Sequence, residues 1–409
     1  MKCRHCQSEV TLPLIDLGNA PPSNAYLNEN TLKLPEKHYP LKIMICEQCW
    51  LVQTEDFANA DELFNPDYAY FSGFSQSWLI HCQQYVDEMV KRFHLTSKHH
   101  VIEIAANDGA LLQYVNAHHI PCIGIEPTAS TAYAARKKGI AIIEAFFGVS
   151  LANTLVAQSK QADLMIANNV LAHVPDINDF VAGFSIALKE NGVATFEFPH
   201  LHQLIDQHQF DTIYHEHFSY LSLITVNNLF TANGLTIFDV EELKTHGGSL
   251  RVYAQRSDSG KQLPSTKVNL LLKKEIAMGL STTHYYKNFQ SKANTIKSNF
   301  IDFLKQAKKE NKQVVGYGAA AKGNTLLNYA QVDSDLISFI VDKNPAKQGK
   351  FMPGSHIPIV DESHLKKTKP DYIVILPWNL KAEIMQQLNY VKKWGAKFVT
   401  TIPELEIIL

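Results

Sequence analysis

Short apolar runs alternate with amphipathic helical patterns twice along this chain. The first series contains "VIEIA", "CIGIE", "DLMIANNV" and "GVATFEF", separated by helical patterns such as "TASTAYAARKKG" and "DINDFVAGFSIALKENG". The second series contains "QVVGYGA", "LISFIVD" and "DYIVIL", and follows a Lys-rich helical stretch at about 264–312. Apolar strands that alternate with helices are typical of parallel sheets covered by helices. The sequence therefore predicts an α/β protein with two Rossmann-like domains.

A chain of 409 residues is too long for one ordinary hydrophobic core. Residues 1–75 differ from the rest, because they combine cysteine pairs, short strand-like runs and prolines that prevent long helices. We expect a small N-terminal module at 1–75 and a first Rossmann-like domain at 76–260. A C-terminal unit at 261–409 begins with a helical linker and continues as the second Rossmann-like domain.

Four of the six cysteines form two Cys-x-x-Cys pairs. This spacing lets one tight turn direct two thiolates at a common ion, and two such turns complete a tetrahedron around Zn²⁺. A closed shell of four thiolates has no open position for water, so we expect a structural zinc site. Its predicted ligands are Cys3, Cys6, Cys46 and Cys49. A nucleic-acid zinc ribbon is the rival interpretation, but the flanking "LIDLGNAPPSNAYL" lacks the basic and aromatic residues which that role requires.

The formal net charge of −2, with both signs interspersed, gives no electrostatic reason to expect nucleic acid or a membrane surface as partner. No run of about 18 apolar residues occurs, and "MKCRHCQSEV" has no apolar signal region. We therefore expect a cytoplasmic protein with a small-molecule partner.

The turn "EIAANDG" is similar to the first motif of S-adenosylmethionine-dependent methyltransferases, and Glu126 ends the next strand, where a carboxylate can accept both ribose hydroxyls. A dinucleotide would need a glycine-rich turn here, whereas an acidic turn suits a cationic cofactor. The aromatic pair in "EAFFG" suits an adenine face, although core packing explains it equally well. The predicted cofactor residues are Glu103, Asn107, Asp108, Gly109, Glu126, Phe146, Phe147, Asn168 and Asn169.

The second Rossmann-like domain carries "VVGYGAAAKGNTLLN", with Gly316, Gly318 and Ala321 at fingerprint spacing and Asp342 after the next strand. This pattern admits a nicotinamide-dependent nucleotide-sugar oxidoreductase. The same geometry could instead hold a nucleotide diphosphate at the helix N-terminus, with Lys322 and, in support, Asn324. We prefer the second interpretation, because a complete methyl-donor site precedes this domain.

The densest run of titratable residues is "FDTIYHEHFSYLS" at 210–222. Taken alone, it could be a solvated loop, a metal site or an acid–base centre. Further along, "HGGSLRVY" offers His246 and Arg251 as candidates for substrate contact, and a tight turn before a strand explains them almost as well.

Several stretches together resemble the sugar C-methyltransferases that act on nucleotide-linked 4-keto-deoxysugars, the family of the tetronitrose 3'-C-methyltransferase. They are "CRHC", "LIDLGNAPPSNAYL", "YPLKIMICEQCWLVQ", "NPDYAYFSG", "EIAANDG", "NNVLAHVPD", "FDTIYHEHFSYLS", "HGGSLRVY" and "GYGAAAKGNTLLN". The resemblance implies an N-terminal zinc module, a central S-adenosylmethionine domain and a C-terminal domain that helps to hold the nucleotide sugar. One departure is Ala105, where many members have glycine.

The resemblance implies C-methylation of a keto-sugar beside the ketone. A dTDP-linked substrate is expected and C3 is favoured, although C3 and C5 are acidified alike. It maps the catalytic base to His217, its neighbouring carboxylate to Glu216 and the tyrosine to Tyr214. His173, and Tyr68 or Tyr70, are expected to contact the substrate or to close the pocket. Two alternatives stay open: the oxidoreductase named above and a non-catalytic nucleotide-sugar binding protein.

Overall fold

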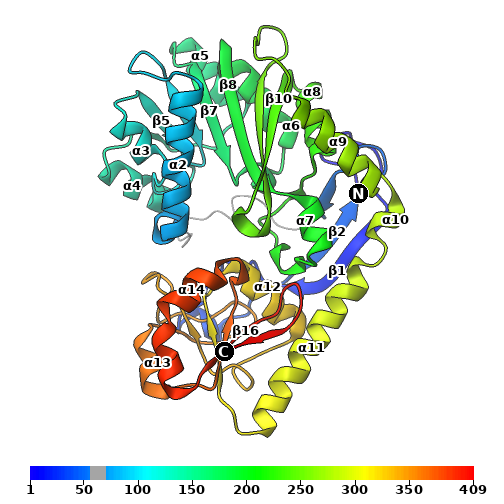
Figure 1. Ribbon diagram of the computed structural model, residues 1–409, viewed down its shortest axis with the longest axis vertical. Coiled ribbons are helices and arrows are strands. Elements are labelled where there is room, and N and C mark those ends of the chain that lie inside the picture. Colours follow the sequence, from blue (N-terminus) through cyan, green and yellow to red (C-terminus); the bar gives the residue numbers. More distant parts are fainter. Residues whose placement is uncertain (56–70) are drawn as a thin grey trace.

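The computed structural model describes residues 1–55 and 71–409. Two lobes, each built on a largely parallel sheet, face one another across a waist, and the N-terminal strands lie along one side of this waist (Figure 1). The long helix α11 (Phe289–Lys309) runs down the same side and leads into the second lobe. The predicted α/β class, with a zinc-binding region, a Rossmann-like methyltransferase domain and a C-terminal domain with parallel strands, is confirmed.

The first lobe contains a seven-stranded sheet in the order β10-β11-β8-β7-β4-β5-β6. Strands β4 to β8 are parallel, while β11 pairs antiparallel with both β8 and β10. The strands are β4 (Val101–Ile104), β5 (Cys122–Ile125), β6 (Ile142–Ile143), β7 (Ala162–Asn168), β8 (Leu188–Pro199), β10 (Leu235–Leu243) and β11 (Ser249–Arg256). The chain order reverses between β4 and β7, and ligands bind at such a switch point in open α/β sheets.

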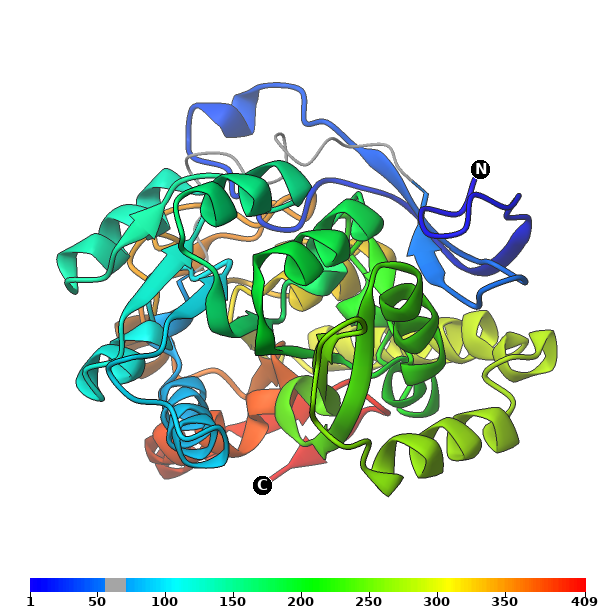
Figure 2. The same ribbon diagram turned by 90° about the horizontal axis from the view of Figure 1, so that it is seen from above.

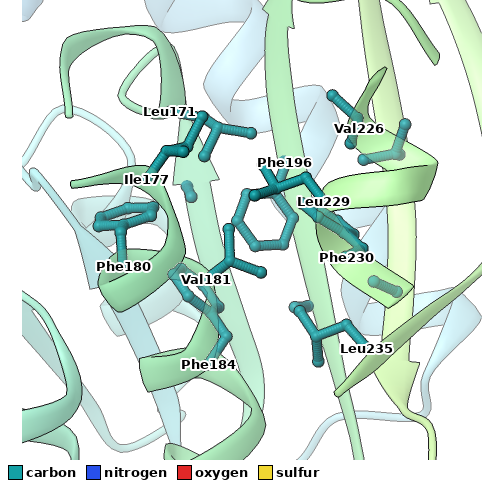
Figure 3. Packing of buried hydrophobic residues seen from close by; sticks show 14 of the residues in the cluster. Leu171, Ile177, Phe180, Val181, Phe184, Phe196, Val226, Leu229, Phe230 and Leu235 are labelled. Atoms are coloured by element: carbon teal, nitrogen blue, oxygen red, sulfur yellow. The ribbon is translucent and has the colours of Figure 1, made fainter. Parts of the chain in front are cut away.

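Helices cover this sheet because their apolar stripes bury against it. They are α2 (Gln76–Arg92), α3 (Leu112–Ala117), α4 (Ala129–Lys137), α5 (Val149–Ala157), α6 (Ile177–Ala187), α8 (Leu223–Ala232) and α9 (Thr266–Met278). Figure 3 shows Phe184 of α6 and Phe230 of α8 packed against Phe196 of β8, and Phe180 of α6 packs against Phe184. Asp176 caps α6 by accepting a hydrogen bond from the backbone N–H of Asp179, which fixes where the helix begins.

The N-terminal strands β1 (Leu12–Ala20), β2 (Tyr39–Ile45) and β3 (Val52–Thr54) form an antiparallel sheet. Its fourth strand is β9 (Ser219–Tyr220), which directly follows the "YHEH" run. The preceding α7 (Leu201–Asp206) and η4 (Phe210–Thr212) pack in one apolar cluster with β1, α11 and the C-terminal sheet. The "YHEH" segment is therefore held between the N-terminal module and the second lobe, and Figure 2 shows the N-terminal strands along the outside of the molecule.

The second lobe contains a six-stranded sheet in the order β14-β13-β12-β15-β16-β17, parallel except for β17. The strands are β12 (Val314–Tyr317), β13 (Ile340–Val341), β14 (Ile359–Val360), β15 (Tyr372–Ile375), β16 (Lys397–Thr400) and β17 (Glu406–Ile408). The remaining helices are α10 (Thr283–Tyr286), α12 (Ala321–Ala330), α13 (Ser363–Thr368) and α14 (Lys381–Gln387). Among the described residues, no helix is long and apolar enough to cross a membrane.

Candidate active site

The four predicted zinc ligands converge. Their sulfur atoms all lie within 4.8 Å of one another, and the Cys3–Cys49 and Cys6–Cys46 sulfur pairs are 3.5 Å apart. Tetrahedral Zn²⁺ with Zn–S bonds of about 2.3 Å places its sulfurs about 3.8 Å apart, so the cluster fits the ion. The shell is almost closed to solvent, which suits a structural ion.

A cavity of about 320 Å³ opens at the switch point of the first sheet, within the size range of small-molecule sites. Its wall combines apolar side chains with a few polar groups from the ends of several strands. The predicted residues on it are Asn107, Glu126, Phe146, Phe147, Asn168, Asn169, His173 and His246.

The turn after β4 is built from backbone in the left-handed region, with φ of 54° at Ala105 and 49° at Asn107. Glu126 stabilises this turn, because its two carboxylate oxygens accept the backbone N–H groups of Asn107 and Thr128, both at 2.9 Å. A glycine at position 105 would adopt this φ at lower cost. Ala105, which stands where many members of the family have glycine, is thus a strained residue in the wall of the cavity.

Polar and aromatic groups of the wall fit S-adenosylmethionine. Both side-chain amide atoms of Asn168 and the Oδ1 atom of Asn169 are buried, and none of them has a hydrogen-bond partner among residues 1–55 and 71–409. Such groups normally find a partner, so a ligand with donors and acceptors is expected here. Phe146 is 53% exposed and offers a ring face, whereas Phe147 packs against Phe180 and Phe184 in the core.

Three predicted cofactor residues lie behind the cavity wall. Glu103 is buried inside β4, and burial, followed by the charges of Asp108 and Glu126, raises its pKa well above the usual value. Asp108 forms an ion pair with Lys138 at 3.0 Å. Gly109, with φ 73°, packs against Ile140. They shape the turn rather than line the cavity, because the left-handed backbone turns Asp108 toward α4.

His217 and Tyr214 form one hydrogen-bonded unit beside this cavity. The Nδ1–H of His217 donates to the backbone oxygen of Thr212 at 2.9 Å, and its Nε2 accepts from the Tyr214 hydroxyl at 2.8 Å. The His173 ring, which lines the cavity, lies 4.6 Å from the His217 ring. Burial, followed by the neighbouring His173, lowers the pKa of His217 well below its usual value, so the ring is neutral.

His173 is oriented by the same segment, because its Nδ1 donates to the backbone oxygen of Glu216 at 2.8 Å. Burial lowers the pKa of His173 to about 4. The neutral ring therefore carries its lone pair on Nε2.

Glu216, the carboxylate that the resemblance implies beside the base, makes its side-chain hydrogen bond to Asn24 rather than to His217. Its carboxylate accepts a hydrogen bond of 2.5 Å from the Asn24 side chain, and Thr212 orients His217 instead. Burial raises the pKa of Glu216 to about 7. The adjacent His215 is buried and donates to backbone oxygens of β2.

The candidates in "HGGSLRVY" separate. His246, with φ 53°, lies on the cavity wall, and its Nε2 is 3.3 Å from the Asn169 amide nitrogen. Arg251 is 3% exposed and forms ion pairs with Glu88, Glu197 and Glu241, so the structure turns it into the sheet rather than toward a substrate. Tyr68 and Tyr70 lie outside the described residues.

The glycine fingerprint of the second lobe lies against side chains of the same protein. Gly318 has φ 87°, and a side chain there would clash with Pro377. The next residue, Ala319, donates its N–H to Asp342 at 2.8 Å. Its carbonyl oxygen accepts from both Tyr26 and Lys347, at 2.6 and 2.7 Å. The turn is thus engaged by the N-terminal module and by Lys347.

Lys322 and Asn324 lie on α12, where this helix meets the "YHEH" segment. The Lys322 ammonium donates to Asn379 at 2.7 Å and lies 4.6 Å from the centre of the Trp378 ring. Asn324 is 1% exposed, and neither of its side-chain amide atoms has a hydrogen-bond partner within the described chain. Thr325 on the same helix donates to the backbone oxygen of Ile213.

Sequence reasoning missed the residues that join the parts. They are Asn24, Tyr26, Asp211, Lys347, Trp378 and Asn379. Only the last pair carried a signal, because "PWN" follows a strand of a parallel sheet and so lies at its ligand-binding edge. The other four residues make contacts between domains, and a single sequence does not show which residues of different domains come together.

Comparisons with known proteins cover the whole chain. Family models match residues 3–64 (zinc binding domain), 78–240 (methyltransferase domain) and 244–403 (C-methyltransferase C-terminal domain). The chain is 30% identical over 407 residues to C-methyltransferase NovU from Streptomyces niveus, covering 100% of this chain and 96% of that protein.

Two solved structures show partial likeness. The PH0226 protein from Pyrococcus horikoshii is 15% identical, with a TM-score of 0.39, and the match covers 49% of this chain and 100% of that one. An S-adenosylmethionine-dependent methyltransferase from Clostridium acetobutylicum is 11% identical, with a TM-score of 0.35, and the match covers 45% and 92%.

The methyltransferase domain and the zinc-binding cysteines define an S-adenosylmethionine-dependent methyltransferase with a zinc-binding domain. Within this class, the match to NovU along nearly the full length of both proteins is decisive. The chain belongs to the C-methyltransferase family, and this assignment replaces the oxidoreductase alternative.

Proposed function

We propose that this enzyme methylates a carbon beside the ketone of a nucleotide-linked 4-keto-deoxysugar, with a dTDP-linked substrate and C3 as the favoured choices. The cofactor contributes a methyl group on a positively charged sulfur when bound. A sugar C–H is a weak acid unless a neighbouring ketone accepts the charge as an enolate, so the protein must provide a base and a hydrogen-bond donor.

One observation carries the proposal: a neutral histidine with a fixed tautomer lies one ring away from the cofactor cavity. Thr212 holds the proton of His217 on Nδ1, which leaves the lone pair on Nε2. The pKa of His217 is lowered by burial, so this lone pair is present at neutral pH. The His173 ring bridges His217 and the cavity.

In the proposed step, Nε2 of His217 takes the proton from the carbon, and the C–H electron pair moves into the enolate. The Tyr214 hydroxyl, which donates to Nε2 in the free enzyme, turns to the keto oxygen and stabilises its developing charge. Hydrogen bonds in a free enzyme are often rearranged when substrate binds. The enolate pair would then form the new carbon–carbon bond to the methyl group, while the methyl–sulfur bond would break and leave its electron pair on the sulfur, which becomes a neutral thioether. The imidazolium returns its proton to solvent.

The C-terminal domain supplies the nucleotide end of the proposed site. Lys322 places its half-buried amino group at the start of α12, where Asp211 favours the charged form, and the Asn324 amide has no hydrogen-bond partner among the described residues. Both are groups that recognise phosphate and base or sugar edges. The zinc cluster holds the module that supplies Asn24 and Tyr26.

Exchange in deuterated water tests the base directly. The enzyme is incubated with a nucleotide-linked 4-keto-sugar and S-adenosylhomocysteine, which cannot donate a methyl group. Wild type should wash deuterium into the carbon beside the ketone, and His217→Asn should not. Turnover of His217→Asn should fall by about 10²–10⁴-fold, the usual contribution of general-base catalysis.

His215→Asn is the matched control, because His215 lies two positions away and donates to β2 backbone oxygens instead. It should leave exchange intact. Normal methylation by His217→Asn would refute the assignment of the base. A panel of nucleotide 4-keto-sugars, with product mass measured, tests the substrate class, and no methylated product from any of them would overturn it.

A further inference from the structure

Trp378 lies where three segments meet. It begins η6 (Trp378–Leu380) at the carboxyl end of β15, and its indole N–H donates to Asp211 of η4 at 2.7 Å. The same ring lies under the Lys322 ammonium, 4.6 Å from its centre. Its far edge contacts Gly247 of η5 (Thr245–Gly247), where an added Cβ would come within 2.5 Å of the ring. One side chain thus touches the "YHEH", "HGGS" and "GYGAAAKG" regions.

Asp211 is fully buried. Its Oδ2 accepts from Trp378, whereas its Oδ1 has no hydrogen-bond partner in the part of the chain that the structure describes. The positive charge that compensates Asp211 is Lys322, whose ammonium donates to Asn379 and not to the carboxylate. Asp211 therefore favours the charged form of Lys322 electrostatically, without a direct hydrogen bond to it. The ammonium group thus keeps N–H donors for an anionic ligand.

The same residue reaches the base through the backbone. Thr212, which follows Asp211, accepts the Nδ1–H of His217. Gln209, on the other side of η4, donates to the backbone oxygen of Gly247. The position of the Thr212 oxygen thus depends on how η4 is anchored to Trp378 and to η5.

We propose that Asp211 and Trp378 are positioning residues that couple the diphosphate-binding end of the substrate site, at Lys322, to the base His217. This inference rests on the proposed function. Asp211 supplies the charge that keeps Lys322 cationic in a buried place, and the Trp378 hydrogen bond anchors the segment that orients the base.

The charges that face Lys322 come from each neighbouring element and define the sign of the pH effect. Asp211 of η4 is the anion, while His246 of η5 and His217 are neutral rings whose protonation Lys322 opposes. Burial lowers the pKa of Lys322 and Asp211 raises it. Without the carboxylate, Lys322 loses its proton at lower pH, and an anion that needs the ammonium dissociates there.

Two variants separate the two roles. Asp211→Asn keeps an oxygen for the Trp378 N–H but removes the charge. Affinity for thymidine diphosphate is measured by calorimetry from pH 6 to pH 9.5. The pH above which this affinity falls should be lower by about one unit in the variant, the effect of losing one nearby charge. Trp378→Phe keeps a ring under Lys322 but removes the N–H. It should lower kcat for methyl transfer about tenfold, with unchanged affinity for S-adenosylmethionine.

The controls make the same chemical changes elsewhere in the second lobe. Asp371→Asn removes a carboxylate that pairs with Lys312, and Trp394→Phe removes an indole hydrogen bond to Pro370. Both should leave the pH limb and kcat as in wild type. The coupling is overturned if Asp211→Asn binds thymidine diphosphate with the wild-type pH profile, or if Trp378→Phe methylates at the wild-type rate. Wild type that binds no nucleoside diphosphate would instead overturn the proposed substrate class, and the coupling with it.

Discussion

The two lobes place the same feature, a turn from a central parallel strand into a helix, in opposite situations. In the first lobe, the turn after β4 borders a cavity of about 320 Å³ where Asn168 has unmatched amide atoms. In the second lobe, the turn after β12 is engaged by Tyr26, Asp342 and Lys347 from the same chain. The first crevice, at the turn after β4, is therefore the open one, although its turn matches the glycine fingerprint less well than the turn after β12 does.

The difference shows what a glycine fingerprint encodes. Gly318 allows close approach to the backbone, and here Pro377 makes that approach, not a pyrophosphate. The N-terminal module therefore does more than hold zinc, because its Tyr26 and Asn24 reach the second crevice and Glu216. Each prediction below tests whether the first crevice binds its ligand independently while the second depends on the N-terminal module.

The largest effect is expected from loss of zinc. Structural zinc contributes on the order of 10 kcal/mol to the folding of isolated zinc-finger peptides, so chelation, or Cys46→Ser, should unfold the N-terminal module. Tyr26 would then leave the second crevice, Asn24 would leave Glu216, and methyl transfer should cease. Hydrogen exchange should show lost protection in residues 1–55, while calorimetry should still detect S-adenosylmethionine binding.

Cys122→Ser is the matched control, because Cys122 is not among the clustered cysteines. It should leave both measurements as in wild type. Parallel loss of zinc and of cofactor affinity would show that the two crevices are not independent, and a zinc-free protein that is folded and active would refute the structural role of the ion.

Glu126 tests the open crevice. Glu126→Gln replaces one carboxylate oxygen by an N–H₂ group, which cannot accept from the Asn107 or Thr128 N–H. Affinity for S-adenosylmethionine should fall by about 1.5–3 kcal/mol, because charge-assisted hydrogen bonds are lost. Glu144→Gln is the control and should leave this affinity unchanged. Glu144 lies near the end of β6, and within the described chain its ion pair is with Arg136. Unchanged affinity in Glu126→Gln would place the ribose elsewhere.

The open crevice was also the more predictable part from the sequence. Asn107, Glu126 and Asn168 follow strands of one parallel sheet, so chain topology alone brings them to one edge. The α/β class and the cysteine cluster were predictable for the same kind of reason, since local periodicity and spacing encode them.

The junction was not predictable, because its contacts join residues far apart in the chain. Asn24 meets Glu216 across 192 positions, and Trp378 meets Asp211 across 167. The family resemblance implied Glu216 as the carboxylate beside His217, yet side chains of adjacent residues in a turn diverge, and that of Glu216 bonds to Asn24. The backbone oxygen of Thr212 takes that role, and side-chain patterns carry no signal for a backbone acceptor.

Glu216 offers a smaller effect through pH. Burial raises its pKa to about 7, so the carboxyl takes up a proton as the pH falls through that value. Catalysis is expected to require the ionised carboxylate that accepts from Asn24, so kcat/KM should fall about tenfold per pH unit below 7. Glu216→Gln should abolish this limb, whereas Glu242→Gln, an exposed partner of Lys274, should retain it. A profile that is flat from pH 5 to pH 7 in wild type would remove Glu216 from the reaction.

The smallest effect is expected from Tyr26, which tests whether the second crevice is engaged from within. Tyr26→Phe keeps the ring beside Lys347 and removes the hydrogen bond to the Ala319 oxygen, so the free energy of unfolding should fall by about 1 kcal/mol. Tyr286→Phe removes a similar buried bond to Leu280 and should cost a similar amount, but without affecting the crevice. Fluorescence titration with NADH should show no binding to wild type. Tyr26→Ala removes the whole ring, and its binding of NADH should be weak at most, because Lys347 still bonds to Ala319. Tight NADH binding by the wild type would mean that the second turn accepts a dinucleotide, and the contrast between the two crevices would then be lost.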